Sequence, residues 1–200
     1  MKHAAVAILT VLIMGCSAPA ADEKAADEKA PDHFTVNFDT SRGPVAIEVN
    51  RADAPVGADR FYTLVKNHYF DGARFFRVVP GFVVQFGLAG DPAVIKKWDV
   101  PIQDETPKTS NVRGTLTFAA SSMPNSRTTQ MFINLGDNPR LDGLGFAPIG
   151  KVVGGMENAD QIYSGDGENP QQDQIQAQGN AYLAKEFPNL DYIKSARIVQ

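Results

Sequence analysis

The chain is poor in the residues that disulfides, metal sites and cofactor-binding motifs require. Its 200 residues include one Cys, which excludes an internal disulfide and any site built from several cysteines. The three His (His3, His33 and His68) are isolated, and none lies at metal-ligand spacing from a second His or Cys. Gly-x-Gly-x-x-Gly and Walker-type loops are missing as well, so nothing supports nucleotide binding. We therefore expect the protein to need no metal and no cofactor.

Strong charge of either sign is also missing. The formal net charge is −4, and no cluster of Lys and Arg marks a nucleic-acid-binding surface. A hydrophobic content of 43% in 200 residues is enough for the core of one domain. Composition predicts a globular domain without a strongly charged partner.

The first residues have the features of an export signal. Lys2 precedes an apolar run, Ala4 to Ile13, that is too short for a permanent membrane helix. The run leads into Leu12-Ile13-Met14-Gly15-Cys16-Ser17, which resembles a bacterial lipobox and predicts cleavage before Cys16 and acylation of that residue. The alternative is an ordinary secretory signal that is cleaved after Ala18-Pro19-Ala20. Both alternatives export the protein.

We therefore expect residues 1–15 to be a lipoprotein signal peptide and the mature protein to lie on the periplasmic side of the cell envelope. Acyl chains on Cys16 would anchor it, because each buried methylene contributes about 0.8 kcal/mol. Ser17 resembles the residue found in lipoproteins of the outer membrane; without lipidation the protein would be soluble in the periplasm. Residues 16–32 include two copies of Ala-Asp-Glu-Lys-Ala and no large apolar residue, which predicts a flexible tether before a folded domain at 33–200.

Short strands dominate the expected secondary structure. Apolar and polar residues alternate over 34–38 and 45–49 around the turn Ser41-Arg42-Gly43-Pro44, which predicts a β-hairpin. Pro55 suits the first position of a helix that continues to His68. We expect further strands over 114–120, 130–134, 147–153 and 193–199, helices over 156–163 and 175–187, and a loop over 87–110. Many short strands with few helices favour an antiparallel barrel, which leaves no exposed edge when its last strand closes it.

The stretch from Phe75 to Gly87 is central to the interpretation. Two apolar runs flank the turn signal Pro80-Gly81, so we expect two strands that meet at a bend. Side chains alternate along a strand, so Arg77 should share a face with Phe75, and Gln85 with Val83. A guanidinium and an amide among Phe and Val form either a polar part of the core or the floor of a groove. This stretch alone leaves both interpretations open.

Three blocks of sequence occur in a recognisable order. They are Phe75-Phe76-Arg77-Val78-Val79-Pro80-Gly81-Phe82-Val83-Val84-Gln85; Gly114-Thr115-Leu116-Thr117-Phe118-Ala119 with Gln130-Met131-Phe132-Ile133-Asn134; and Leu141-Asp142-Gly143 with Phe146-Ala147-Pro148-Ile149-Gly150-Lys151-Val152. Together they resemble the cyclophilins, a family of peptidyl-prolyl cis-trans isomerases, over about Phe34 to Val199. The resemblance implies a mainly β fold: a closed eight-stranded antiparallel β-barrel capped by two helices. The segment from about 166 to 191 is extra relative to a minimal member of the family, and we expect it to add helical structure before the last strand.

Such an enzyme needs no covalent intermediate. Rotation about an X-Pro bond faces a barrier of ~18–20 kcal/mol, because the nitrogen lone pair is conjugated with the carbonyl. A guanidinium aimed at that nitrogen forms a stronger hydrogen bond when the amide twists, which lowers the barrier. Arg suits this role because it stays charged and presents its donors in a fixed plane.

Carried over by position, the resemblance implies that Arg77 is the catalytic residue and that Gln85 binds the substrate backbone and orients Arg77. The proline pocket would be lined by Phe82, Val83, Phe132 and Leu141. Ala119, Ala120 and Ser121 would lie beside the residues that precede the proline, and Gln130 and Phe146 fall at further positions of the groove. The alternative interpretation makes Arg77 a surface arginine and the apolar residues ordinary core.

Some positions depart from the family pattern. Arg140 occupies a rim position where many cyclophilins have Trp, so we expect weak binding of cyclosporin-type ligands. Phe146 stands where His is usual, which changes the polarity expected of the rim. Val83 stands where Met is common and shortens the pocket wall, which should alter substrate preference more than the rate of rotation. The loop 121–129 is one residue longer than is common.

The leading hypothesis is an exported, monomeric peptidyl-prolyl isomerase that acts on proline-containing polypeptides and assists folding in the envelope, with no nucleic-acid partner. One alternative is a chaperone module that binds proline peptides with little catalysis. Another is a structural lipoprotein that uses the barrel as a scaffold.

Overall fold

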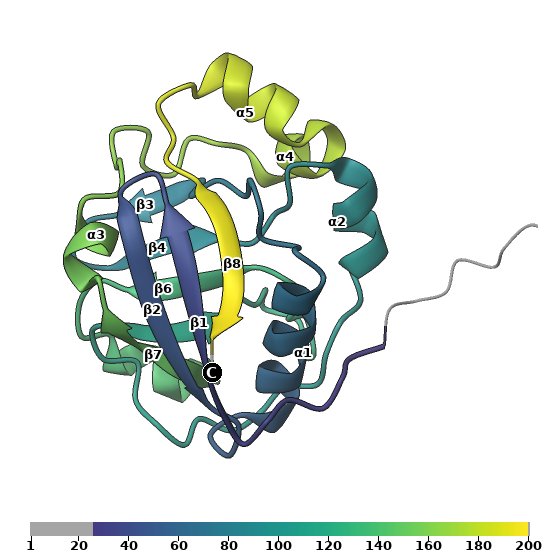
Figure 1. Cartoon of the computed structure of the whole chain (residues 1–200), viewed down its shortest axis with the longest axis vertical. Coiled ribbons are helices and arrows are strands. Elements are labelled where there is room, and N and C mark those ends of the chain that lie inside the picture. The colour runs from purple at the N-terminus through teal and green to yellow at the C-terminus, as the bar shows by residue number, and fades with distance from the viewer. Residues whose placement is uncertain (1–25, 200) are drawn as a thin grey trace, which may run out of the picture.

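A computed structural model of the chain describes residues 26–199, and Figure 1 shows their arrangement. The predicted signal peptide, Cys16 and most of the predicted tether lie outside the described residues. In the described part of the chain eight strands make up one antiparallel sheet: β1 (His33–Thr40), β2 (Gly43–Asn50), β3 (Arg77–Val79), β4 (Val83–Phe86), β5 (Thr115–Phe118), β6 (Met131–Asn134), β7 (Pro148–Gly154) and β8 (Ile193–Val199). Their order in the sheet is β3-β4-β6-β5-β7-β2-β1-β8. The predicted hairpin is confirmed as β1–β2, which pair from His33–Asn50 to Thr40–Gly43.

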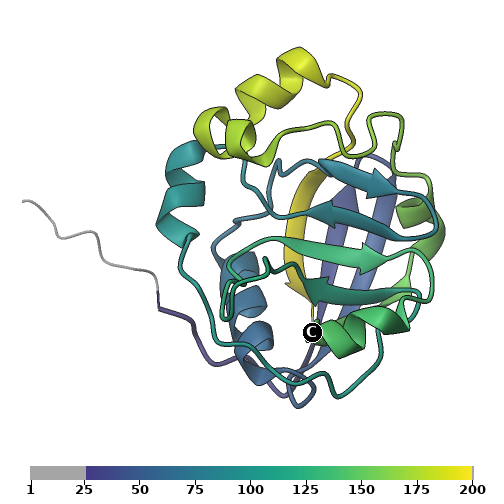
Figure 2. The same ribbon diagram turned by 180° about the vertical axis from the view of Figure 1, so that it is seen from behind.

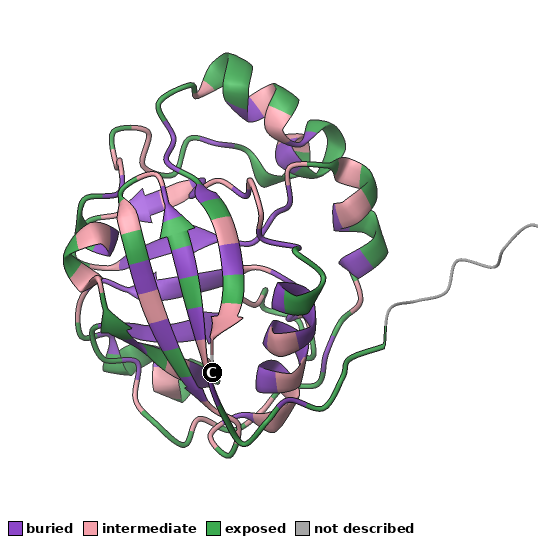
Figure 3. Ribbon diagram, viewed as in Figure 1, coloured by how far each residue is buried: buried purple, intermediate pink, exposed green. Residues whose placement is uncertain are grey.

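The sheet curls so that its two halves face each other. Strands β1, β2 and β8 run crosswise to β3, β4 and β6, as Figures 1 and 2 show from opposite sides. Buried and exposed residues alternate along β1, with Val36 and Phe38 in the core; Figure 3 shows this alternation along the strand. The core between the halves is rich in Phe rings, and Phe86 packs edge-on against Phe38, Phe70 and Phe75.

The prediction of a closed barrel is wrong. Among the described strands, β3 pairs only with β4 and β8 only with β1, so the sheet is an open, curled half-barrel. The segments that precede these edge strands meet at an isolated bridge, Arg74–Tyr192. Strand β3 is only three residues long, and the Val78 N–H donates to the Gly167 carbonyl at 3.1 Å. A loop therefore takes the place along β3 that a closing strand would need.

Within residues 26–199 five α-helices and one 3-10 helix accompany the sheet: α1 (Pro55–Lys66), α2 (Pro92–Trp98), η1 (Pro139–Leu144), α3 (Met156–Asp160), α4 (Gln172–Gln178) and α5 (Asn180–Glu186). Helix α1 packs against β7 and β8, and α3 against β2. Helix α2 lies where we expected only a loop. The single helix expected over 175–187 is two helices, because Gly179 has a positive φ of 59° and packs against the Gly90 carbonyl. The extra helical segment before the last strand is confirmed, and α4 packs beside α2 (Figure 2).

The described end of the predicted tether contacts the domain. Asp27 accepts a hydrogen bond from Arg60 Nε at 2.7 Å, and the Ala30 N–H donates to Asp59 at 2.8 Å. Ala30 is buried. These contacts tie residues 27 and 30, which precede β1, to the domain. The buried guanidinium of Arg60 explains the contact, because it needs an anionic partner. Within residues 26–199 no helix has the length and apolar character to cross a membrane.

Candidate active site

A row of side chains crosses three neighbouring strands on the face of the sheet opposite the main core. Arg77 on β3 is the register partner of Gln85 on β4, and Gln85 is in turn the partner of Phe132 on β6. Register partners on antiparallel strands lie side by side. Val84 and Phe86, which alternate with Gln85 along β4, belong to the main core. The alternation that buries those two residues therefore turns Gln85 toward the other face.

Hydrogen bonds fix the polar part of this row. Arg77 Nη1 donates to Gln85 Oε1 at 3.3 Å, and Gln85 Nε2 donates to Gln130 Oε1 at 2.9 Å. Gln85 is buried at 7% exposure. The oxygen of its amide is bonded to Arg77 and the nitrogen to Gln130, so both ends of the amide have a partner. The amide oxygen faces the guanidinium and accepts from one N–H of its Nη1, which restrains the orientation of Arg77.

An apolar cluster separate from the main core lies beside the guanidinium. Val83, Phe132 and Leu141 are its buried members, and Phe82, Ala119 and Phe146 pack against them partly exposed. The rings of Phe132 and Phe146 meet edge to face with centroids 5.9 Å apart. This separation decides between the two interpretations of the central stretch: Arg77 and Gln85 form the floor of a groove.

The short helix η1 brings Leu141 to the groove. The carboxylate of Asp142 accepts hydrogen bonds from the Asn111 N–H at 2.9 Å and from Asn111 Nδ2 at 2.7 Å, and Ser110 also donates to it. Burial would raise the pKa of Asp142, but the hydrogen bonds from Ser110 and Asn111 outweigh it and lower that pKa. Asn111 Nδ2 also donates to the Phe146 carbonyl at 2.8 Å. The buried Asn111 amide thus bonds both to Asp142, the neighbour of Leu141, and to Phe146.

A cavity of about 490 Å³ lies over this row, and every sequence-predicted substrate residue lines it together with the predicted catalytic one. These residues are Arg77, Phe82, Val83, Gln85, Ala119, Ala120, Ser121, Gln130, Phe132, Leu141 and Phe146. They come from positions up to 69 residues apart, and the curl of the sheet brings them together. These predicted residues give the cavity one guanidinium, two side-chain amides and an apolar pocket.

One expectation about the central stretch is wrong. Phe75 does not share a face with Arg77: it is buried in the main core, whereas Arg77 lines the groove. Strand β3 begins only at Arg77, so the alternation of a strand does not extend back to Phe75.

The rim carries a second guanidinium. Arg140 lies over the Phe82 ring at 4.9 Å from the centroid, and Arg77 lies 5.7 Å from the same centroid. Arg140 is exposed. This rim position, where the sequence comparison led us to expect Trp, therefore presents a positive charge to solvent.

Sequence reasoning missed several residues of the site. Asp99, Ser126, Thr128, Gln172 and Gln176 also line the cavity. Glu168 bonds to Arg77. These residues lie outside the three matching blocks, and no local motif marked them. Among residues 26–199 no group of three or more His, Cys, Asp or Glu side chains is placed to hold a metal ion.

The chain is similar to known proteins over most of its length. Residues 35–180 match the family model described as "Cyclophilin type peptidyl-prolyl cis-trans isomerase/CLD". A peptidyl-prolyl cis-trans isomerase A of Dickeya dadantii is 34% identical over 173 residues, which cover 84% of this chain and 87% of that protein. A peptidyl-prolyl cis-trans isomerase of Acinetobacter baylyi is 38% identical over 132 residues, which cover 64% of this chain and 70% of that protein.

Solved structures support the fold. A cyclophilin-type isomerase of Cryptosporidium parvum superposes with a TM-score of 0.65 at 22% identity, covering 84% of this chain and 98% of that one. The same protein, crystallised in the presence of the dipeptide Ala-Pro, gives a TM-score of 0.64 at 23% identity, covering 83% and 99%.

Proposed function

The chain belongs to the cyclophilin-type peptidyl-prolyl cis-trans isomerases, and on this basis we propose that it isomerises X-Pro bonds in exported proteins, using Arg77 as its catalytic residue. The enzyme class follows from the family. The role of each residue, the folding of envelope proteins as its task and the monomeric, lipid-anchored form are the proposal.

In the proposed mechanism the apolar cluster holds the proline ring and Arg77 acts on the amide. The ring lies against Phe132, Leu141 and Val83, where it is removed from water. As the amide twists, its nitrogen loses conjugation and becomes an acceptor for Arg77. That hydrogen bond is stronger in the transition state than in either planar isomer, so it lowers the barrier.

The observation that carries the proposal is the position of Arg77 in one cavity with the apolar cluster, with Gln85 bonded to its Nη1. A guanidinium held beside an apolar pocket is the arrangement that this mechanism of amide rotation needs. The crystallisation of the Cryptosporidium parvum relative in the presence of Ala-Pro is consistent with a proline ligand for this groove.

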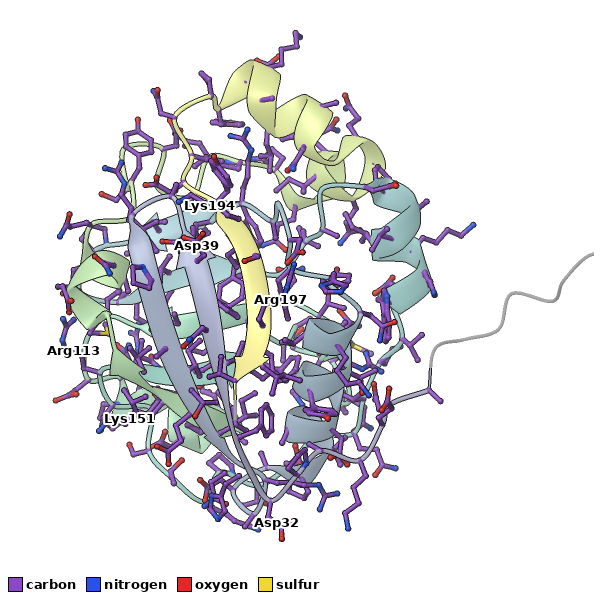
Figure 4. All side chains as sticks on the ribbon, viewed as in Figure 1. Asp32, Asp39, Arg113, Lys151, Lys194 and Arg197 are labelled. Carbon is purple, nitrogen blue, oxygen red and sulfur yellow. The ribbon has the colours of Figure 1, made fainter. Side chains whose placement is uncertain are left out.

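The experiment is a prolyl-peptide isomerisation assay of the wild type and Arg77→Ala. Arg197→Ala is the matched control, because Arg197 also pairs with a carboxylate, Asp71, but lies on β8 (Figure 4). We expect Arg77→Ala to lose about a hundredfold in kcat/KM, the size typical for one transition-state donor, and the control to keep wild-type activity. Equal rates for wild type and Arg77→Ala would refute the mechanism.

A second function, a proline-peptide-binding chaperone with little catalysis, is favoured only by the altered rim at Arg140 and Phe146. Saturable binding of a proline peptide to the wild type without any acceleration of its isomerisation would decide for the chaperone.

Export and anchoring rest on the sequence of residues 1–17. Mass spectrometry of the mature protein from a bacterial envelope tests both at once. We expect an N-terminal Cys16 that carries acyl chains, and Cys16→Ser to release the protein from the membrane. A mature N-terminus immediately after Ala20 would show that an ordinary secretory signal is cleaved and that the protein is exported without a lipid anchor.

A further inference from the structure

Arg77 has a second polar neighbour, and it comes from the extra segment before the last strand. Arg77 Nε donates to Glu168 Oε1 at 2.6 Å, and Nη2 contacts the same oxygen. The two residues are 91 positions apart. The family resemblance assigned no role to this segment. The contact between Glu168 and Arg77 is therefore a feature that the resemblance does not imply.

The backbone holds Glu168 at this position. The Val78 N–H of β3 donates to the carbonyl of Gly167 at 3.1 Å, which ties the loop to the free edge of the strand that carries Arg77. Two further bonds tighten the loop: Gly167 N–H to the Ser164 carbonyl at 3.1 Å and Asn169 N–H to the Asp166 carbonyl at 2.9 Å. The residues that flank Val78 and Gly167, namely Arg77 and Glu168, are thereby brought together.

The same segment also forms part of the groove. Helix α4 follows Glu168 closely, and its Gln172 and Gln176 line the cavity together with Arg77. Residues four apart lie on one face of a helix. Buried Ile175 fixes α4 to the domain. The segment therefore contacts the site at two independent places.

We propose that Glu168 is a positioning residue for Arg77, an inference that rests on the proposed function of that arginine. A guanidinium has five N–H donors in one plane. Glu168 accepts along the Nε–Nη2 edge and Gln85 accepts from Nη1. These contacts hold the plane on two sides and leave one N–H on each terminal nitrogen for the proline amide.

The exposure of the Arg77–Glu168 pair makes it possible to distinguish a role in positioning Arg77 from a role in stabilising the fold. The Glu168 side chain is 61% exposed and that of Arg77 27%. Ion pairs in such exposed positions add little to the stability of the fold. A loss of activity without a loss of stability is therefore the signature of positioning.

The test compares Glu168→Ala and Glu168→Gln with Glu157→Ala, which removes an exposed carboxylate of α3 outside the groove. We expect Glu168→Ala to lose about tenfold in kcat/KM, which corresponds to ~1.4 kcal/mol of transition-state stabilisation. Its proline-peptide affinity and Tm should stay at wild-type values. Glu168→Gln should recover part of the rate, because an amide oxygen still accepts from Nε, and Glu157→Ala should match the wild type.

The double variant Arg77→Ala/Glu168→Ala shows whether Glu168 acts through Arg77. If it does, the double variant has the same residual activity as Arg77→Ala. Wild-type activity or higher in Glu168→Ala, or a further tenfold loss in the double variant, would overturn the inference. Full activity of Arg77→Ala would refute the catalytic role of Arg77 itself. That result differs from those that refute the positioning role of Glu168, so the two failures are distinguishable.

Discussion

Arg77 and Gln85 face each other across the β3–β4 pair, and the Gln85 amide connects the guanidinium to Gln130. Gln85 and Gln130, which are 45 residues apart and belong to two different sequence blocks, thereby share one chain of hydrogen bonds. The polarity of the central stretch is explained by this chain.

The first prediction concerns Gln85. Replacing it with Ala removes one of the contacts that direct Arg77, so we expect kcat/KM to fall about tenfold, as for the loss of one oriented charge-assisted hydrogen bond. Gln161→Ala, an exposed position after α3, is the control. Unchanged activity of Gln85→Ala in the peptide isomerisation assay would contradict the orienting role.

The second prediction uses two leucines of η1. Leu141 is 7% exposed and lines the groove, whereas Leu144 is 70% exposed. Leu141→Ala should weaken proline-peptide binding about tenfold, since part of the apolar contact with the ring is lost. Leu144→Ala should bind the peptide normally. Titration calorimetry with one proline peptide measures both, and equal affinities would remove Leu141 from the pocket.

The third prediction concerns alkaline pH. The buried Tyr69 hydroxyl donates to Thr129 Oγ1 at 3.0 Å, next to Gln130 of the site, and burial raises the pKa of Tyr69 to about 12. In the unfolded chain a tyrosine titrates near pH 10, so between pH 10 and 12 the unfolded state releases a proton that the folded state keeps. The wild type should therefore lose about 3 kcal/mol of stability across that range from this group alone.

Tyr69→Phe removes the titrating group and provides the comparison. Chemical denaturation at pH 8 should show the variant about 1 kcal/mol less stable, because the hydrogen bond is lost. That difference should shrink and reverse as the pH approaches 12. Parallel pH dependences of the two proteins would contradict the raised pKa.

The fourth prediction concerns the N-terminal contact. Arg60 is 2% exposed, and besides Asp27 it donates to the carbonyls of Val100 at 2.8 Å and Thr128 at 3.1 Å. Asp27→Ala leaves the buried charge of Arg60 without this carboxylate partner. We expect the free energy of unfolding to fall by about 2 kcal/mol, less than for a fully buried pair because Asp27 is partly exposed. Asp32→Ala, the exposed position labelled in Figure 4, is the control. Equal free energies of unfolding for the two variants would show that residues 26–30 do not stabilise the domain.

The sequence predicts local features better than contacts between distant segments. Alternation and turn residues predict β1, β2 and β4 because these signals are local, and the apolar pocket follows from the matching blocks. The open edge of β3 was not predictable, because it depends on a loop 89 residues away, Gly167 against Val78.

Two other features that the sequence analysis did not predict also depend on contacts between distant segments, whereas a third had a local signal that was not used. The pairing of Glu168 with Arg77 has no counterpart in local sequence, and neither has the pairing of Asp27 with Arg60. Helix α2 did have a signal: Asp91 caps it by accepting from the Ala93 N–H at 2.8 Å, and Pro92 occupies its first position. The glycines that precede it favoured the interpretation as a loop.

The central claim is that Arg77 lowers the barrier to rotation of the bound proline amide. NMR exchange spectroscopy on a saturating proline peptide measures the cis-trans interconversion on the enzyme separately from binding. We predict that Arg77→Ala slows this interconversion about a hundredfold while the peptide still binds in the groove. An interconversion rate equal to that of the wild type would contradict the account.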